Sequence, residues 1–376
     1  MVGLLREGMG YALYAIIIIL GCMKKRSKKI TILMCLYMWL LIALNNSTAD
    51  YFAYEEMYLC SFEPRYSGHE IGFMTICRIC LKLSFPYIMF RCVISFVIVY
   101  FTYKGLAYFT NRINFALALY LIFPFLGSAS GLRQACSSAV ILYLMRFLIE
   151  DGRKETIKYV IGVGIATLFH YSSVFYILYI IAKYKKSKNV SMFLQCAILT
   201  IVTLAISKTG VLYSIASKVI SRQKTLHWLS SSGLYFSPLY AIVLGVFIFF
   251  LYAIYVAKSM IQRQWDDGIC CNTKLEYKQV EIVSRAIIIS LLAFIGAIYN
   301  SVVFLRLVTT LIPVGYAVCC DGFAAYASDC TQRYRICSQM KIGLIIFCIL
   351  VSLFVFGYWI GGDVLTVPVK NYLFGG

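Results

Sequence analysis

The chain has 376 residues, 61% of them hydrophobic, and a formal net charge of +19. Soluble domains contain about 45–50% apolar residues, whereas apolar runs long enough to cross a membrane recur along this chain, so no soluble domain is expected. The 35 Lys and Arg residues stand in short blocks between these runs, a pattern that orients membrane proteins and argues against a nucleic-acid-binding surface.

The apolar runs predict an all-α, polytopic membrane protein that forms one domain over residues 1–376, with about ten full spans. The first run is followed by KKRSKK instead of a small-residue cleavage site, so it is predicted to be an anchor. Cys77 and Cys80 have zinc-like spacing but no second pair, and we expect no metal. The predicted spans are 9–23, 30–48, 86–103, 107–127, 131–149, 190–207, 236–257, 286–304, 307–326 and 342–360.

Basic residues predict which segments face the cytoplasm. With KKRSKK inside, alternation gives cytoplasmic segments that hold most of the Lys and Arg: 24–29, 104–112, 150–158, 183–189, 258–285 and 327–341. This assignment works only if the run Tyr159–Ala182, which has basic clusters on both sides, does not cross. We interpret the run as a re-entrant hairpin of two helices of about 11–13 residues, each about 16–20 Å long. The alternative is one ordinary span.

The tip of this hairpin would carry His170, facing a cavity open to the outside, because broken backbone at membrane depth requires protein or a water-filled cavity around it. In the alternative reading, His170 is a hydrogen-bonded histidine inside a single span. The remaining external segments would be 49–85 and 208–235, both with amphipathic stretches.

Segment 49–85 begins at a carboxylate, Asp50, which is either a solvated helix end or an acid of a site. Glu70 follows in GHEIGF, and Arg78 and Lys82 share one face of a predicted helix. The segment is interpreted either as an interfacial helix at the lipid headgroups or as a lid for a substrate with lipid and polar parts.

Two arginines stand at predicted external ends of spans, Arg133 in SASGLRQACSSAV and Arg306 in SVVFLRLVTTLIP. An arginine at mid-span costs about 2.5–3.5 kcal/mol, so it indicates a function unless its side chain reaches the headgroups. Guanidinium groups bind phosphate oxygens in a bidentate manner. Together with His170 they predict one external cavity for a phosphate-bearing, lipid-linked ligand.

Several motifs carry a resemblance to a known family. The segments LRQACSSAVILYLMRFLIE, IATLFHYSSVFYILYIIAKYKK, ADYFAYEEMY with HEIGF, FLRLVTTLIP and VPVKNYLF resemble the EpsG/Wzy-type bacterial polysaccharide polymerases. Leu132 stands where the family usually has Ile, and Val369 follows Pro368 where an aromatic residue is common. The likeness runs over most of the chain.

The resemblance implies a multi-pass enzyme of the bacterial inner membrane, similar to metal-independent glycosyltransferases of the GT-C class. It would join oligosaccharide repeats carried on undecaprenyl pyrophosphate at the periplasmic face, in exopolysaccharide, capsule or O-antigen synthesis, without a cofactor. The expected partners are the lipid-linked donor and acceptor, the bilayer, a chain-length regulator and a flippase, but no nucleic acid. A flippase or other transporter, an O-antigen ligase and a membrane O-acyltransferase remain alternatives.

In this mechanism Arg133 and Arg306 would hold the pyrophosphate, and Glu70 would position sugar hydroxyls. His170 would act as the base or orient the acceptor, with Asp50 as the rival base. Inversion is expected because no covalent nucleophile is evident beside a second carboxylate. The expected catalytic residues are His170 and Asp50, and the expected substrate-binding residues are Arg133, Arg306, Glu70, Gln134 and Arg78.

Overall fold

The computed structural model describes residues 2–46, 48, 50–184, 238–266, 274–290, 293, 306–326, 331–359 and 362–369. Every regular element in these residues is helical, which confirms the all-α class. Five helices among them are long and apolar enough to cross a membrane: Tyr87–Phe109, Ile113–Ser130, Leu132–Ile149, Arg306–Ala324 and Arg335–Gly357. The predicted span 190–207 and the predicted external segment 208–235 lie outside the described residues. The count of ten spans stays a prediction.

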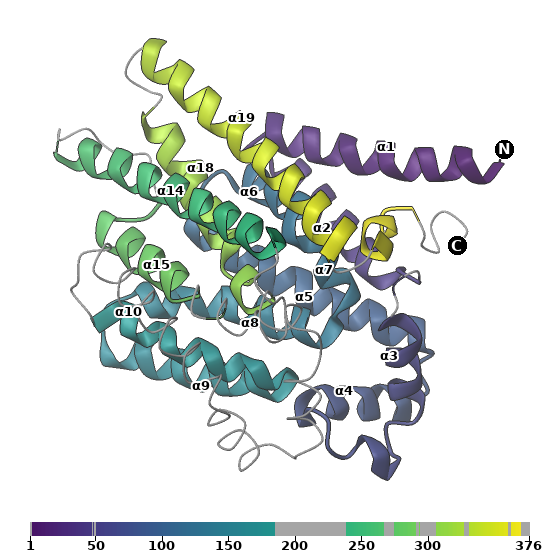
Figure 1. Cartoon of the computed structure of the whole chain (residues 1–376). Helices are drawn as coiled ribbons and strands as arrows, with labels where there is room; N and C mark the ends of the chain where they lie inside the picture. Colours follow the sequence, from purple (N-terminus) through teal and green to yellow (C-terminus); the bar gives the residue numbers. More distant parts are fainter. Residues whose placement is uncertain are drawn as a thin grey trace.

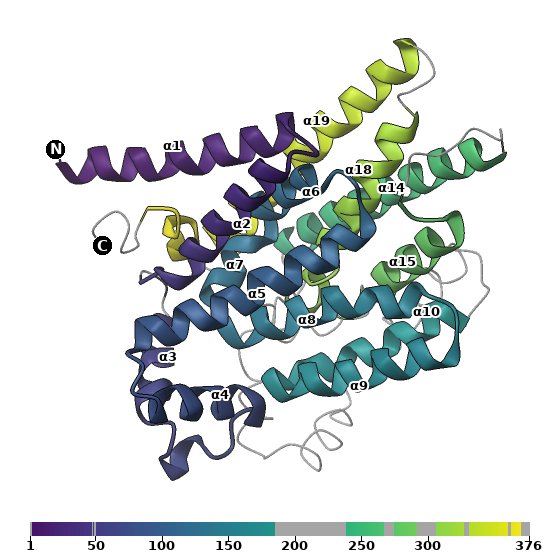
Figure 2. The same cartoon turned by 180° about the vertical axis from the view of Figure 1, so that it is seen from behind.

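The N-terminal half is a row of packed helices. It contains α1 (Val2–Met23), α2 (Lys28–Ala43), α5 (Tyr87–Phe109) and α8 (Leu132–Ile149). α2 packs against α5, α5 against α8, and α8 against α9 (Arg153–Phe169), and Figure 2 shows α5, α8 and α9 side by side. Between α5 and α8 the chain forms α6 (Ile113–Tyr120), a π-helical turn η2 (Leu121–Phe125) and α7 (Leu126–Ser130).

The C-terminal half packs against this row. Its helices are α14 (Pro238–Asp266), α15 (Tyr277–Ser290), α18 (Ile312–Tyr326) and α19 (Thr331–Phe354), followed by the short helices η4 (Val355–Trp359) and η5 (Gly362–Thr366). α18 lies at the centre, in contact with α6, α14 and α19 (Figure 1). Its side chains Tyr316, Cys319 and Phe323 are fully buried, so the apolar sequence of α18 forms the core between the two halves.

The run around His170 returns to the end of the molecule from which it starts. After α9, His170 has an extended backbone (φ −157°), and the chain comes back as the 3₁₀-helix η3 (Tyr171–Tyr179) and the short α10 (Ile180–Tyr184). Thr156 Oγ1 lies 3.2 Å from the Tyr184 hydroxyl, and Lys183 Nζ donates to Thr156 Oγ1 at 3.0 Å. The chain therefore turns back at His170 and does not continue as one straight helix, whereas the depth of this hairpin in a membrane stays a prediction.

The returning leg differs from the α-helix that we expected, because nine of its residues are 3₁₀-helical. The Tyr159 hydroxyl donates to the carbonyl of Tyr176 at 2.8 Å, and so takes an acceptor that an α-helical bond would use. A 3₁₀-helix rises about 2.0 Å per residue, so a short segment can still match the length of α9.

The loops meet at two opposite ends, as the alternation of sides predicts. At one end, Lys183 Nζ donates to the Glu150 carbonyl (2.5 Å), and a salt bridge joins Lys278 to Asp151 (2.9 Å). Both contacts join segments that we expected in the cytoplasm. At the other end, segment 49–85 meets the start of α8 and the hairpin tip. Which end faces the cytoplasm stays a prediction.

Several boundaries differ from the expected ones. The predicted cytoplasmic loop 258–285 is largely helical, because α14 continues to Asp266 and α15 begins at Tyr277. The predicted span 107–127 begins later than expected, because the break between α5 and α6 falls at residues 110–112. Segment 49–85 folds as α3 (Asp50–Leu59), the 3₁₀ turn η1 (Pro64–Tyr66) and α4 (Ile71–Lys82). The two cysteines of CRIC face the core from α4.

Candidate functional site

The site begins at the junction between α7 and α8. α7 ends at Ser130 and α8 begins at Leu132, so only Gly131 separates two successive apolar helices. Arg133 and Gln134 therefore lie in the first turn of α8, where backbone N–H groups have no partner within the helix and the helix dipole is positive. Gly131 supplies no capping side chain. This helix end favours an anion.

An ion-paired cluster joins this turn to α4 and to the hairpin tip. Glu70, only 4% exposed, precedes α4 and accepts from Arg133 Nη1 at 2.6 Å through Oε2. Its other oxygen, Oε1, lies 3.1 Å from Nδ1 of His170. The same Arg133 nitrogen lies 3.3 Å from Nδ1 of His69. The structure thus brings together three residues that the sequence analysis named, and it adds His69.

A glycine permits this close approach of α4 to the tip of α9. A Cβ built on Gly72 would lie 2.9 Å from the carbonyl oxygen of Leu168, closer than real Cβ contacts. Gly72 lies two residues after Glu70, and Leu168 lies two residues before His170. The absence of a side chain on Gly72 therefore lets the Glu70 carboxylate approach the His170 imidazole. This close contact explains why the HEIGF motif has a glycine at position 72.

The electrostatics of Glu70 favour its ionised form. Burial raises the pKa of this carboxyl, but the hydrogen bond with His170 and the charge of Arg133 outweigh it, and the pKa is lowered to about 2. Because a carboxylate only accepts hydrogen bonds, Nδ1 of His170 carries the proton in this contact. The opposite ring nitrogen, Nε2, is thereby left to accept a proton from another group.

Tyr54, which was not predicted as a site residue, lies beside Arg133. The guanidinium of Arg133 lies 5.6 Å from the centre of its ring. Burial raises the pKa of the Tyr54 hydroxyl, and the charge of Arg133 acts against this rise. Asp50 begins α3, one turn before Tyr54, and accepts from Ser130 Oγ at 3.4 Å. The spaced tyrosines of ADYFAYEEMY were a visible signal, but nothing local distinguishes Tyr54 from its neighbours.

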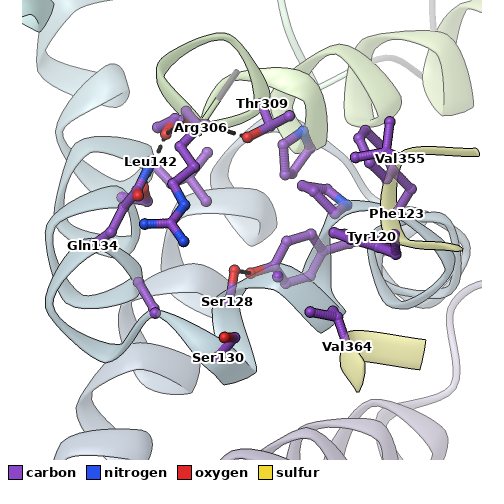
Figure 3. Close-up of a pocket in the computed structure, with 18 residues that line it drawn as sticks. Tyr120, Phe123, Ser128, Ser130, Gln134, Leu142, Arg306, Thr309, Val355 and Val364 are labelled. Atoms are coloured by element: carbon purple, nitrogen blue, oxygen red, sulfur yellow. Dashed lines mark hydrogen bonds between the residues drawn. The ribbon is translucent and has the colours of Figure 1, made fainter. Parts of the chain in front are cut away.

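Arg306 occupies a small cavity on the other side of the α7–α8 junction (Figure 3). In Figure 3 its guanidinium extends past Gln134 towards Ser128. The volume is about 60 Å³, room for a few water molecules. A Cβ on Gly131 would be in ordinary contact with the guanidinium carbon, at 3.9 Å, so the guanidinium lies directly beside the start of α8. Among the described residues, no carboxylate forms a salt bridge with Arg306, and Gln134 Oε1 is buried without a hydrogen-bond partner.

Arg78 is not brought into this cluster. It lies on α4, and its Nε donates to the carbonyl of Ser61 at 2.9 Å while the guanidinium lies 5.9 Å from the ring of Phe62. These contacts hold the turn between α3 and α4. A role for Arg78 in substrate binding stays a prediction.

Comparison with known proteins assigns the chain to a family. The model of the EpsG family matches residues 12–374, nearly the whole chain. No curated protein matches, and no solved structure matches.

Proposed function

The chain belongs to the EpsG family, and we propose that it polymerises oligosaccharide repeat units carried on undecaprenyl pyrophosphate at the periplasmic face of the bacterial inner membrane. The family supports a role in polysaccharide biosynthesis, and the apolar helices support a multi-pass membrane protein. A GT-C-like arrangement and a product that is an exopolysaccharide, capsule or O-antigen belong to the same proposal.

The excess of positive charge at the start of α8 carries the proposal. Arg133 and Arg306 both lie beside this helix end, and only Arg133 has a carboxylate partner among the described residues. A guanidinium beside the positive end of a helix is unfavourable unless an anion joins them. A pyrophosphate has the charge and the oxygens to bind both arginines and the free N–H groups. No metal is needed for this contact, because the charge of arginine is permanent.

The reaction would be a displacement at the anomeric carbon of the donor. The acceptor hydroxyl oxygen forms the new glycosidic bond, the bond from the anomeric carbon to the pyrophosphate breaks, and the electron pair leaves with the pyrophosphate beside the arginines. Nε2 of His170 takes the hydroxyl proton, which contributes about 10²–10⁴-fold to the rate. A single displacement inverts the anomeric centre.

Glu70 receives a different role from the one first expected. Both of its oxygens have partners within the protein, Arg133 and His170, so we propose that it orients His170 and does not bind sugar hydroxyls. Asp50 remains the alternative base. Among the described residues, the hydrogen bond that its carboxylate accepts is the 3.4 Å one from Ser130 Oγ, which leaves it able to contact a hydroxyl.

The test uses the purified chain in lipid nanodiscs with a synthetic lipid-linked repeat unit, and products are sized on a gel. We expect a ladder of polymers with the wild type, and none with Arg306→Gln. Arg65→Gln is the matched control, because this arginine is 53% exposed and pairs with Glu56 and Glu63 on the surface. A wild-type ladder from Arg306→Gln would refute the pyrophosphate site. Transfer of one unit to a different acceptor without a ladder would indicate a ligase.

A further inference from the structure

An apolar groove lies between the first and the last long helices. Its volume is about 620 Å³, and α1 and α19 form its sides (Figure 1). Aliphatic side chains line it: Ile18 and Ile19 from α1, Ile345 and Ile349 from α19, and Ile122 and Leu126 from the floor. Ile19 and Ile349 are 54% and 43% exposed, so the groove is open towards the surrounding membrane.

The C-terminal segment closes one end of this groove. After α19 the chain passes through η5 and reaches α1 at Gly10, where a Cβ would lie 2.7 Å from the Pro368 carbonyl oxygen and 2.7 Å from Val369. Leu365 and Pro368 line the groove. We call residues 362–369 the strap. It lies at the end of α19 that carries η4, and Figure 1 shows it beneath α1.

The strap and its neighbours also form the wall of the Arg306 cavity. Val364 lines the cavity, whereas the next residue, Leu365, lines the groove. In η2, Phe123 lines the cavity and Ile122 the groove. The rings of Phe123 and Phe356 lie 5.5 Å apart within this wall. One layer of residues therefore separates a cationic cavity from an apolar groove.

We propose that the groove between α1 and α19 holds the prenyl chain of a lipid-linked glycan whose diphosphate lies at Arg306. This inference rests on the proposed function. A prenyl diphosphate has an anionic end next to a long hydrocarbon. The chain offers a matching pair of features: a guanidinium that has no carboxylate partner among the described residues, and an aliphatic groove next to it. In this proposal the diphosphate lies on the cavity side of the layer and the prenyl chain on its groove side.

A second groove of similar size supplies a control within the same molecule. It lies between α2 and α5, has a volume of about 590 Å³ and is lined by Ile32, Leu36 and Phe96 among others. None of its lining residues is adjacent in sequence to a residue of the Arg306 cavity. We therefore expect ordinary bilayer lipid there, without preference for a prenyl chain.

The experiment is photolabelling of the full-length protein in nanodiscs with a polyprenyl pyrophosphate that carries a diazirine in its chain. We expect labelled peptides from residues 11–23 and 345–353, and loss of the label when unlabelled polyprenyl pyrophosphate, but not phosphatidylglycerol, is added. Ile349→Trp should reduce the label several-fold, whereas Ile32→Trp, the same change at a residue 68% exposed in the second groove, should not.

Equal labelling of the two grooves, or labelling that phosphatidylglycerol also removes, would overturn the inference. The site of labelling in the wild type decides this even if Ile349→Trp does not fold. Labelling needs no turnover, so its outcome is separate from that of the proposed function. If the groove is labelled specifically but the protein never polymerises repeat units, only the proposed function is refuted. If the protein polymerises but the groove is not labelled, only the present inference is refuted.

Discussion

Replacing Glu70 by glutamine changes the charge of the cluster with little change in shape. The amide oxygen would remain with Arg133, which can only donate hydrogen bonds. The amide nitrogen would then face Nδ1 of His170, 3.1 Å away in the native contact. Because that nitrogen donates, Nδ1 must become the acceptor and the ring proton moves to Nε2. The variant therefore holds His170 in the tautomer that cannot act as a base on the substrate.

The magnitude follows from the pKa of Glu70, which is lowered from 4.5 to about 2. At about 1.4 kcal/mol per unit this favours the carboxylate by about 3 kcal/mol, or about 2–3 kcal/mol after allowance for solvent near the partly exposed Arg133 and His170. We expect Glu70→Gln to lower the free energy of unfolding by about this amount and to lower the polymerisation rate by about 10²–10⁴-fold.

The assay is the initial rate of ladder formation at equal amounts of folded protein. Glu56→Gln is the matched control, since Glu56 pairs with Arg65 at 2.9 Å where both side chains are more than half exposed, and such pairs contribute little. A wild-type rate for Glu70→Gln would refute the role of the carboxylate in orienting His170. An equal loss with Glu56→Gln would show that any carboxylate of this segment is required.

The pH dependence of stability has a defined sign. The folded pKa of Glu70 lies below its ordinary value, so its contribution is complete above about pH 4.5 and is lost as the pH falls towards about 2. Glu70 stays ionised across the range in which imidazoles titrate. We therefore expect the free energy of unfolding of the wild type to fall as the pH drops below about 4.5, and that of Glu70→Gln to fall less, as measured by denaturant titration.

Three further predictions concern other parts of the site. Arg306→Lys should keep charge but lose the bidentate fork, giving shorter ladders than wild type where Arg306→Gln gives none; equal ladders would reject bidentate binding. Gly72→Val should separate α4 from Leu168 and slow polymerisation, whereas Gly68→Val, with nothing within 4 Å, should not; equal rates would contradict the close approach. Single cysteines at Arg153 and Tyr184 should both react with a thiol reagent from the cytoplasm, and labelling from opposite sides would reject the re-entrant hairpin.

The sequence was sufficient for the hairpin and for the grouping of the loops, because the orienting effect of basic residues is local and adds up along the chain. The hydrogen bond from Lys183 to Thr156 shows that the two basic segments that flank His170 lie at the same end of the molecule. Arg133 and Glu70 could also be named from sequence, since charged residues near apolar runs are few.

Their contacts could not be predicted from sequence. Glu70 meets Arg133 and His170 across 63 and 100 positions of the chain, and the distance depends on the bare backbone of Gly72. The cavity of Arg306 likewise depends on residues far apart in the chain, from Tyr120 to Val364, that line it together. Helix ends such as Asp266 in α14 were missed because a polar helix that continues beyond the membrane looks like a loop by hydropathy alone.

The hairpin also bears on how this scaffold could diversify. A segment that leaves and rejoins the bundle at the same end does not alter the orientation of any helix that follows it. Residues 153–184 could therefore be lengthened, shortened or exchanged between relatives without inverting the remaining chain. Such changes would have to keep His170 beside Glu70 and the buried contacts of Tyr176 and Tyr179.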